Sequence, residues 1–232
     1  MATTRTLIAD FLGTVPFLAE LGERDIGRFA ERAVVLEPAR GTVIFRQGDP
    51  CAALHVVAHG QVKLLFQNGV GDEKVVELIG AGQIFGEAAL FLGECHLVTA
   101  EAVSYSRVVL LPKEVLLEEI RHNPDFSWRV IDELSRRLYE RTRDLESCVL
   151  RSGTERVIGY LLNQLPADTI NGEGLVTFPA KKGIIASKLN LTHEHFSRIL
   201  RDLATDGLIG VEGRNVRLPD LNKLHARLNG AG

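Results

Sequence analysis

The sequence has few cysteines, and their positions exclude several kinds of site. Cys51, Cys95 and Cys148 are the only three in 232 residues, and they are far apart. They are odd in number and lack CxxC spacing, which argues against a disulfide framework. The same spacing argues against a cysteine-only zinc or iron–sulfur site. We therefore expect no metal site and no iron–sulfur cluster in this protein.

Long hydrophobic runs are also missing. No apolar stretch approaches the roughly 18 residues that indicate a membrane-spanning helix, and Asp10 interrupts the apolar residues near the N-terminus. The N-terminal stretch lacks the basic start and uninterrupted apolar core of a signal peptide. Hydrophobic residues make up 45% of the chain and charged residues 25%, a balance typical of soluble globular proteins. These features predict a cytoplasmic protein with no membrane partner.

The sequence lacks the motifs of several common enzyme classes. It contains no P-loop, no HExxH and no GxGxxG, the motifs that position phosphates, zinc or dinucleotides. No nucleophile and base stand in a recognisable catalytic arrangement. The stretch GAGQIFGE is rich in glycine, but its glycines lie between predicted strands rather than before a helix. We therefore predict that the protein is not an enzyme.

The charges are unevenly distributed along the chain. The formal net charge is −3 for the whole sequence. Residues 151–232 hold 11 Lys and Arg against 8 Asp and Glu, whereas residues 1–150 hold 16 against 22. The C-terminal part is therefore basic and the remainder acidic. Such asymmetry is compatible with a C-terminal part that binds a polyanion, although so few charges are also typical of a solvated surface.

The N-terminal half predicts helices followed by many short strands. Residues 7–33 are typical of one or two short helices. Several runs of β-type residues follow, separated by turn residues such as Gly60, Asn68-Gly69 and the Gly80-Ala81-Gly82 stretch. Short strands at this spacing predict an all-β sandwich or roll.

A long helix is predicted from residue 123 to residue 150. Asn123 is a plausible N-cap, and Pro124 suits the first helical position. Hydrophobic residues then recur alternately three and four positions apart, with Arg141 interrupting the series: Ile131, Leu134, Leu138, Arg141, Leu145 and Cys148. This is the spacing of a coiled-coil seam. We predict a parallel homodimer through Ile131, Leu134, Leu138 and Leu145; the alternative is a stripe that packs on its own domain.

The C-terminal part predicts a winged helix-turn-helix. Residues 182–189 form a short helix, Asn190 tolerates the left-handed conformation of a tight turn, and Thr192 is a good N-cap for the next helix. Two helices joined by so short a turn are typical of a helix-turn-helix. The segments LIGV and VRL around the turn at residues 212–215 then form a hairpin. The buried stripe of the second helix is predicted to contain Phe196, Ile199, Leu200 and Leu203.

The opposite face of that second helix carries side chains suited to reading DNA. Glu194, Ser197 and Arg198 are spaced so that they are neighbours on the helix surface. Arginine can bond guanine O6 and N7 in a fork, and glutamate accepts from cytosine N4. The alternative is that Glu194 only favours the helix dipole and pairs with Arg198. The full predicted DNA-binding set is Thr192, His193, Glu194, Ser197, Arg198, Arg201, Arg214 and Arg217, with Arg214 and Arg217 placed on the wing near phosphates.

The segments GQIFGEAALF and LTHEHFSRIL, together with the predicted roll and long helix, resemble the Crp–Fnr family of bacterial transcription regulators. The resemblance extends from about Val15 to Leu224 and is closest to the Fnr and Dnr side of the family. It implies an α+β chain with a cyclic-nucleotide-binding-like β-roll (jelly roll) at residues 1–122, a dimerisation helix at 123–150 and a winged helix-turn-helix at 151–232. It further implies a homodimeric activator that binds double-stranded DNA at a TTGAT-like inverted repeat and contacts RNA polymerase.

The resemblance also implies an effector site in the roll. Phe85, Gly86 and Glu87 are similar to the family's phosphate-binding cassette, in which a glutamate holds the ribose and a later arginine holds the cyclic phosphate. Here His96, Leu97 or Val98 stands near the arginine's position, and burying a phosphate without a cation is costly. Cyclic AMP is therefore disfavoured, although a cyclic-AMP-dependent regulator of the same architecture is the alternative. The predicted effector-pocket residues are Phe85, Gly86, Glu87, Ala88, His96 and Thr142.

Haem and nitric oxide, associated with Dnr-like members of the family, are the other effector hypothesis. Haem needs an axial ligand such as histidine or methionine, and Met1 is the only methionine. The candidate ligands are His55, His59, His96 and the adjacent Cys95. No cysteine occurs before Cys51, so the N-terminal cluster of the Fnr oxygen sensor is missing and its iron–sulfur chemistry does not carry over.

Overall fold

The computed structural model describes residues 2–67, 73–165 and 172–228. The chain divides into two compact units, Met1–Tyr139 and Glu140–Gly232. The predicted turn at Asn68-Gly69 lies outside the described residues. No helix within the described ranges is both long and apolar enough to span a membrane.

The first unit consists of helices and short strands. It begins with helices α1 (Ala2–Leu12) and α2 (Glu23–Arg32), and it ends with α4 (Lys113–His122) and the first part of α5 (Pro124–Leu150). Between them lie the short helix α3 (Glu87–Leu92) and a series of strands. These strands are β1 (Val34–Leu36), β2 (Val43–Phe45), β3 (Ala53–His59), β4 (Val62–Gln67), β5 (Glu73–Ile79), β6 (Ile84–Phe85), β7 (Thr99–Ala102) and β8 (Arg107–Pro112).

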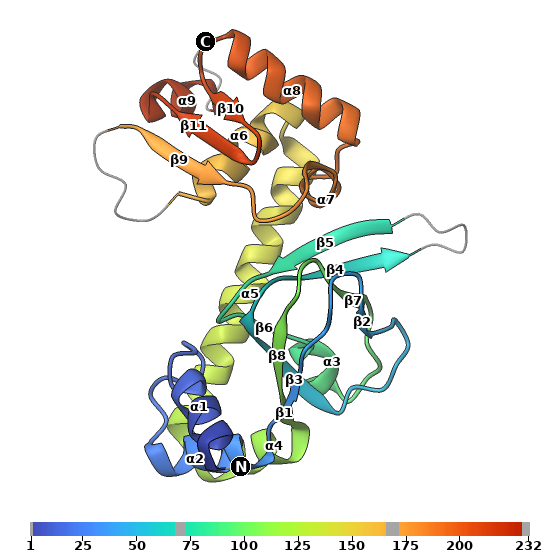
Figure 1. Cartoon of the computed structure of the whole chain (residues 1–232), viewed down its shortest axis with the longest axis vertical. Helices are drawn as coiled ribbons and strands as arrows, with labels where there is room; N and C mark the ends of the chain where they lie inside the picture. Colours follow the sequence, from blue (N-terminus) through green and yellow to red (C-terminus); the bar gives the residue numbers. More distant parts are fainter. Residues whose placement is uncertain (1, 68–72, 166–171, 229–232) are drawn as a thin grey trace. The chain divides into compact units, whose positions relative to one another are not determined.

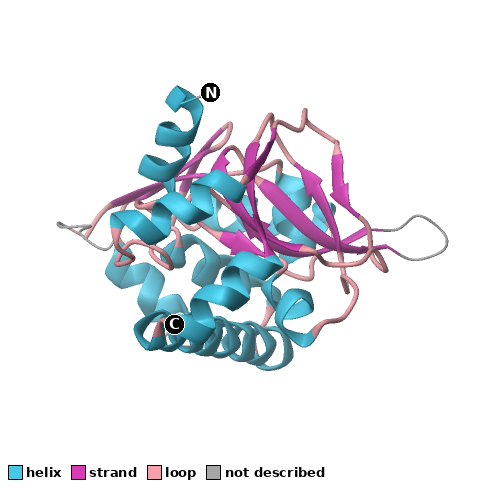
Figure 2. Ribbon diagram, turned by 90° about the horizontal axis from the view of Figure 1, so that it is seen from below, coloured by secondary structure: helices cyan, strands magenta, loops and turns pink. Residues whose placement is uncertain are grey.

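The strands form a roll of two four-stranded sheets (Figures 1 and 2). One sheet has the order β1-β8-β3-β6 and the other β2-β7-β4-β5, and all the pairings are antiparallel. Buried residues of both sheets, such as Val57, Leu64 and Val108, share one core. On the other face of the first sheet, Val56 and Val109 pack with the helices of this unit. This alternation of side chains along a strand is what allows β3 and β8 to serve two cores.

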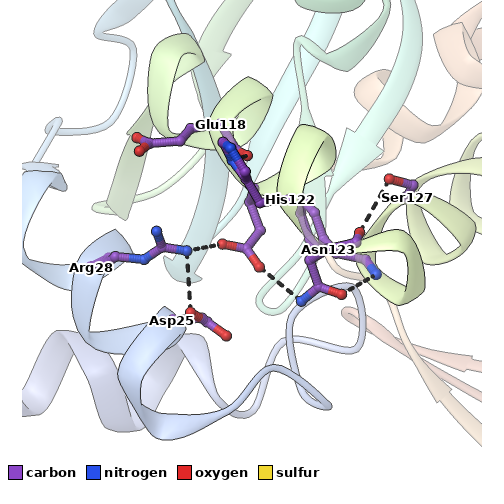
Figure 3. A network of polar contacts seen from close by, with 8 residues as sticks. Asp25, Arg28, Glu118, His122, Asn123 and Ser127 are labelled. Atoms are coloured by element: carbon purple, nitrogen blue, oxygen red, sulfur yellow. Dashed lines mark hydrogen bonds and ion pairs between the residues drawn. The ribbon is translucent and has the colours of Figure 1, made fainter.

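A polar network joins α2, α4 and the start of α5 (Figure 3). The buried carboxylate of Glu119 accepts hydrogen bonds from Arg28 and from Asn123 Nδ2, the latter at 2.8 Å. Asn123 Oδ1 in turn accepts from the backbone amide of Phe126 at 3.1 Å. The predicted N-cap of the long helix is thereby confirmed, because an N-cap side chain satisfies an otherwise unpaired amide of the first turn.

The second unit contains the rest of α5 and the C-terminal elements (Figure 1). Its helices are α6 (Gly153–Asn163), α7 (Lys182–Lys188), α8 (His193–Thr205) and α9 (Leu221–Leu228). A three-stranded sheet of order β10-β11-β9 completes it, with β9 (Gly174–Thr177), β10 (Gly210–Glu212) and β11 (Asn215–Leu218). Helix α6 begins with a capping box between Ser152 and Glu155, which satisfies free amides at its N-terminus.

The predicted fold class is confirmed, with corrections in detail. The helices at the N-terminus, the roll, the long helix and the winged helix-turn-helix are all present. The sequence also predicts a helix at KEVLLEEI, a helix at RSGTERVIGYLLNQL and a strand around GLVT, which are α4, α6 and β9. The elements β1, α3 and α9 were not predicted. The statement that the glycines of GAGQIFGE do not precede a helix is wrong, because Gly86 directly precedes α3. The exact boundaries 1–122, 123–150 and 151–232 stay a prediction.

Candidate nucleic-acid interface and effector site

The turn between α7 and α8 has the local chemistry that the sequence predicts. Asn190 has φ 56°, and it is the single non-glycine residue with positive φ in the described part of the chain. Asparagine tolerates this conformation better than most residues. The hydroxyl of Thr192 accepts a hydrogen bond from the amide of His195 at 3.2 Å and so caps α8. The start of α8 is therefore fixed by residues adjacent in sequence.

Helix α8 buries one face and exposes the other. Its buried residues are Phe196, Ile199, Leu200 and Leu203, as the sequence predicts. Glu194 and Arg198 are exposed, and Ser197 between them is half-buried. The other predicted DNA-binding residues of this region are also exposed, namely Thr192, His193 and Arg201. Glu194 and Arg198 are one helical turn apart, so α8 presents an acceptor and a fork-shaped donor together.

Glu194 has a role in the free protein as well. Hydrogen bonds from its own backbone amide and from the hydroxyl of Thr192 lower the pKa of its carboxyl. A carboxylate at this position also favours the positive end of the helix. Within the described residues, no ion pair joins Glu194 to Arg198. The guanidinium of Arg198 is therefore not held in an ion pair with Glu194.

The two arginines of the wing differ in their surroundings. Arg214 donates from Nε and Nη2 to the carbonyl oxygen of Phe178, at 3.0 and 2.6 Å. The amide of Phe178 donates back to the carbonyl of Arg214 at 2.8 Å. Arg217 is exposed on β11, and no ion pair links it to a residue that the structure describes. Arg214 thus fastens the wing to the segment after β9, while Arg217 is available for phosphate.

This difference gives a prediction about the salt dependence of DNA binding. Arg217→Ala should weaken binding to all sequences similarly and reduce the slope of log affinity against log salt by roughly one unit, as expected for one lost phosphate contact. Arg214→Ala should instead destabilise the wing by about 1–2 kcal/mol, because the Phe178 carbonyl loses both donors. Fluorescence anisotropy at several salt concentrations and thermal unfolding distinguish the two. If both variants reduce the slope of log affinity against log salt equally, Arg214 contacts phosphate as well.

The exposed stripe of α5 differs from the predicted seam. Ile131, Leu138 and Leu145 are exposed, at 51%, 69% and 65%. Leu134 is partly buried and packs against the core of the first unit, so it is not part of a continuous exposed seam. The exposed apolar residues at heptad spacing are instead Trp128, Ile131, Leu138, Leu145 and Val149. Trp128 and Val149, which the sequence analysis did not include, also lie at this spacing. The dimerisation set Ile131, Leu134, Leu138 and Leu145 stays a prediction.

The predicted effector cassette lies at the junction of β6 and α3. Phe85 is buried, and Gly86 has φ 88°, where a Cβ would lie 3.2 Å from Nδ1 of His55. Glu87 is the first residue of α3 and forms an ion pair with Nε of Arg137 at 3.3 Å. Arg137 belongs to the part of α5 within the first unit. Sequence reasoning missed it, because it lies 50 positions from Glu87.

The other predicted pocket residues are placed differently. Ala88 follows Glu87 in α3. Thr142 lies five residues after Arg137 on α5, in the second compact unit, and its role stays a prediction. Leu97 is 69% exposed. The next arginine along the chain, Arg107, pairs with Glu37 at 2.8 Å.

Two histidines of the roll are enclosed by aromatic rings. His96 is 4% exposed and stacks on Phe45 with ring centroids 3.5 Å apart. His55 is 6% exposed, stacks on Phe85 and lies 5.9 Å from His96. Burial, and secondarily the charge of His96, lowers the pKa of His55 to about 4. Burial also lowers the pKa of His96, against the opposing effect of Asp49.

This arrangement does not fit haem. An axial histidine must present a ring nitrogen to the iron beside an apolar space for the macrocycle. His96 instead stacks on Phe45, and His55 packs against both Phe45 and Phe85. The remaining candidates, His59 and Cys95, are exposed. Residues of the described ranges form no group of three or more histidine, cysteine or acidic side chains suited to a metal ion.

Comparison with known proteins identifies both parts of the chain. Residues 35–123 match the cyclic nucleotide-binding domain, and residues 155–227 match the Crp-like helix-turn-helix domain. The chain is 31% identical over 170 residues to the cyclic AMP receptor protein of Thermus thermophilus, covering 73% of this chain and 76% of that protein.

Solved structures share this architecture. DNR from Pseudomonas aeruginosa is 26% identical, with a TM-score of 0.50 and coverage of 94% of this chain and 96% of that one. FixK2 from Bradyrhizobium japonicum has a TM-score of 0.74 at 23% identity, covering 83% of this chain and 96% of that one. The second likeness supports the fold alone.

Proposed function

Because this chain belongs to the Crp/Fnr family of DNA-binding transcriptional regulators, we propose that it is a homodimer that reads an inverted repeat with TTGAT-like half-sites. The observation that carries the proposal is the outward face of α8, where Glu194 and Arg198 lie one turn apart on a helix whose opposite face is buried. The N-terminal half of such a helix is the part that reaches base edges in the major groove. The similarity to DNR supports the Fnr and Dnr side of the family.

Each reading residue has a proposed partner on the DNA. Arg198 forks onto guanine O6 and N7, Glu194 accepts from cytosine N4, and Ser197 bonds either kind of base edge. Thr192, His193 and Arg201 lie on the same exposed surface and position the helix on the backbone, while Arg217 contacts phosphate through the wing. RNA polymerase is the proposed protein partner of the DNA-bound dimer, which acts as an activator.

The substitution Arg198→Ala tests the proposed function. It should cost about 1–3 kcal/mol of binding free energy on a TTGAT-type repeat and relax the preference for guanine, because a bidentate contact supplies base discrimination. Fluorescence anisotropy on the repeat, and on repeats with the guanine replaced, measures both effects. Arg217→Ala is the matched control, since it should weaken all these sequences alike. If Arg198→Ala keeps the guanine preference while weakening every site equally, Arg198 positions the protein rather than reading bases.

Cyclic AMP is not the proposed effector. The position of the family's phosphate-binding arginine falls in the stretch of His96, which is buried on Phe45, and the exposed Leu97. An anionic phosphate in this place lacks the cation that would offset its desolvation. We expect calorimetry to find no cyclic AMP affinity tighter than millimolar. A micromolar dissociation constant would overturn this prediction and favour the alternative, a cyclic-AMP-dependent regulator.

Haem and nitric oxide are not favoured either. His55 and His96 are enclosed by aromatic rings, and the other candidate ligands, His59 and Cys95, are exposed. Reconstitution with haem is a direct check. A Soret band that disappears in His96→Ala would contradict the packing argument and restore haem as the effector. An effector of the roll should therefore be one that needs neither a phosphate-binding arginine nor a bond from His55 or His96.

A further inference from the structure

The segment after β9 joins the sheet of the wing to the helix-turn-helix. Antiparallel pairing of β9 with β11 ends at Thr177, which is paired with Asn215, and α7 begins at Lys182. Between them, Pro179 lacks an amide hydrogen and cannot donate to a sheet ladder. The position of this segment therefore depends on individual contacts rather than on continued strand pairing.

Phe178, the first residue of this segment, is fixed at its backbone by Arg214. Its amide donates to the carbonyl oxygen of Arg214 at 2.8 Å. Its carbonyl oxygen accepts from Nε and Nη2 of the same arginine at 3.0 and 2.6 Å. One residue of the turn between β10 and β11 thus satisfies both backbone groups of Phe178. The paired donation to the carbonyl needs the planar fork of a guanidinium, which lysine lacks.

The ring of Phe178 contacts both α6 and α8. It is fully buried, and its centroid lies 6.4 Å from that of Tyr160 on α6 and 6.0 Å from that of Phe196 on α8. Both distances fall in the range of attractive aromatic pairs. Because buried side chains are closely packed, a displaced ring must be accommodated by its neighbours. A movement of Phe178 is therefore transmitted to α8.

Phe196 lies behind the surface that is proposed to read bases. It follows Glu194 by two positions and precedes Arg198 by two, so its side chain points about 200° around the helix from each of them. Side chains that recognise a partner must be held within roughly 0.5 Å of the productive geometry by the residues that support them. The contact between Phe196 and Phe178 is such a support for Arg198.

Helix α8 has a second support that does not involve Phe178. Gly153, at the start of α6, approaches α8 so closely that a Cβ would lie 3.2 Å from Cδ1 of Ile199 and 3.3 Å from Cε1 of His195. This packing remains when the contact at Phe178 is weakened. We therefore expect a weakened contact to change the orientation of α8 rather than to unfold it.

We propose that Arg214 is a positioning residue for base reading. By holding the backbone of Phe178, it keeps the ring of Phe178 against Phe196 and so fixes the direction in which Arg198 projects from α8. The proposal rests on the DNA reading of the proposed function. It gives a residue of the wing an influence on the guanine preference without any contact to a base, whereas a contact to phosphate affects all sequences alike.

The experiment compares the full-length wild type with Arg214→Lys, Phe178→Leu and the double variant. Arg214→Lys keeps the charge for a phosphate but loses the fork, and Phe178→Leu keeps an apolar side chain but loses the ring. Tyr160→Phe is the matched control. It keeps the ring beside Phe178 and removes only a hydroxyl that has no hydrogen-bond partner in the described part of the chain.

Two quantities are measured for each protein. Fluorescence anisotropy gives the guanine preference, defined as the affinity for the TTGAT-type repeat divided by the affinity for the repeat with the guanine replaced. Hydrogen exchange of residues 193–205 in the DNA-free protein reports how firmly α8 is held. A role of Arg214 in stability alone would lower the affinity for all sequences by one common factor and leave the guanine preference unchanged.

Arg214→Lys and Phe178→Leu should each lower the guanine preference by roughly threefold or more, the size expected for residues coupled through packing. Both should also speed hydrogen exchange in α8. The double variant should fall little below the single variants, because both substitutions act on the same contact. Tyr160→Phe should match the wild type in both measurements.

Two results would overturn the proposal. An unchanged guanine preference in Arg214→Lys would show that a charge suffices at this position, and effects that multiply in the double variant would show that Arg214 does not act through Phe178. Failure of the proposed function has a different signature. If the wild type shows no guanine preference while exchange in α8 still rises in both single variants, the link from Arg214 to α8 is upheld and the DNA-reading assignment fails.

Discussion

Replacing Leu138 by aspartate should convert the protein into a monomer and remove tight binding to the inverted repeat. Leu138 lies at the centre of the exposed stripe that runs from Trp128 to Val149 along α5. In a parallel dimer the two aspartates would face each other, so both desolvation and like-charge repulsion oppose association. A dimer gains on the order of 100- to 10,000-fold in affinity from binding two half-sites at once, and the monomer should lose this gain.

Sedimentation and anisotropy on the same samples check this prediction. Arg143→Asp is the control, because it introduces an aspartate, with an even larger change of charge, on the same helix about 140° further around its axis, at a position that is exposed. It should leave the dimer intact. An unchanged dimer in Leu138→Asp would show that the interface lies elsewhere.

The seam itself shows what a spacing pattern can and cannot predict. Residues 131, 138 and 145 are common to two heptad assignments, one continued by Leu134 and the other by Trp128 and Val149. The sequence alone does not separate them, since both satisfy alternating steps of three and four. The difference is that Leu134 packs on the core of its own unit, a contact with residues distant in sequence.

The helix-turn-helix was predictable because its determinants are local. Asn190 in the turn, Thr192 as the cap and Phe196 on the buried face each act within a few residues, and the rules for such positions depend on neighbours in sequence. The hydrogen bonds from Arg214 to the carbonyl of Phe178 join residues 36 positions apart in the sequence. No spacing rule connects these two residues, so the sequence did not indicate this contact. The phosphate contact of Arg214 stays a prediction.

The β-roll was predictable in class but not in its contacts between side chains. Turn residues and short β-type runs predict strands, yet they do not specify which strands pair. Antiparallel pairing of β3 and β6 places His55 opposite Phe85. The β-bridge between Pro50 and Cys95 holds the neighbouring residue His96 close to this pair. The enclosed histidine pair therefore results from the sheet topology, and it has a consequence for stability.

The first unit should lose stability as the pH falls from about 6.5 to about 4, because His55 resists protonation only when folded. Its pKa is lowered from 6.5 to about 4 by burial and then by His96. Above pH 6.5 the residue is neutral in both states, so its contribution is constant there; at lower pH the unfolded chain binds the proton first and unfolding becomes easier. The shift corresponds to about 3 kcal/mol of unfolding free energy across this range, and His96 acts in the same direction.

Urea unfolding at pH 7, 6, 5 and 4.5, each chosen to sample this titration range, measures the effect. Far-UV circular dichroism is a suitable signal, because Trp128, the only tryptophan, is exposed and lies on the stripe proposed for the dimer. Other acidic groups titrate in the same range, so the informative quantity is the difference between the wild type and His55→Phe, which should retain much less of the pH dependence. His59→Phe is the control, because His59 is exposed. If the wild type and His55→Phe show equal slopes, His55 is accessible to protons in the folded state and the enclosed arrangement with Phe45, Phe85 and His96 is wrong.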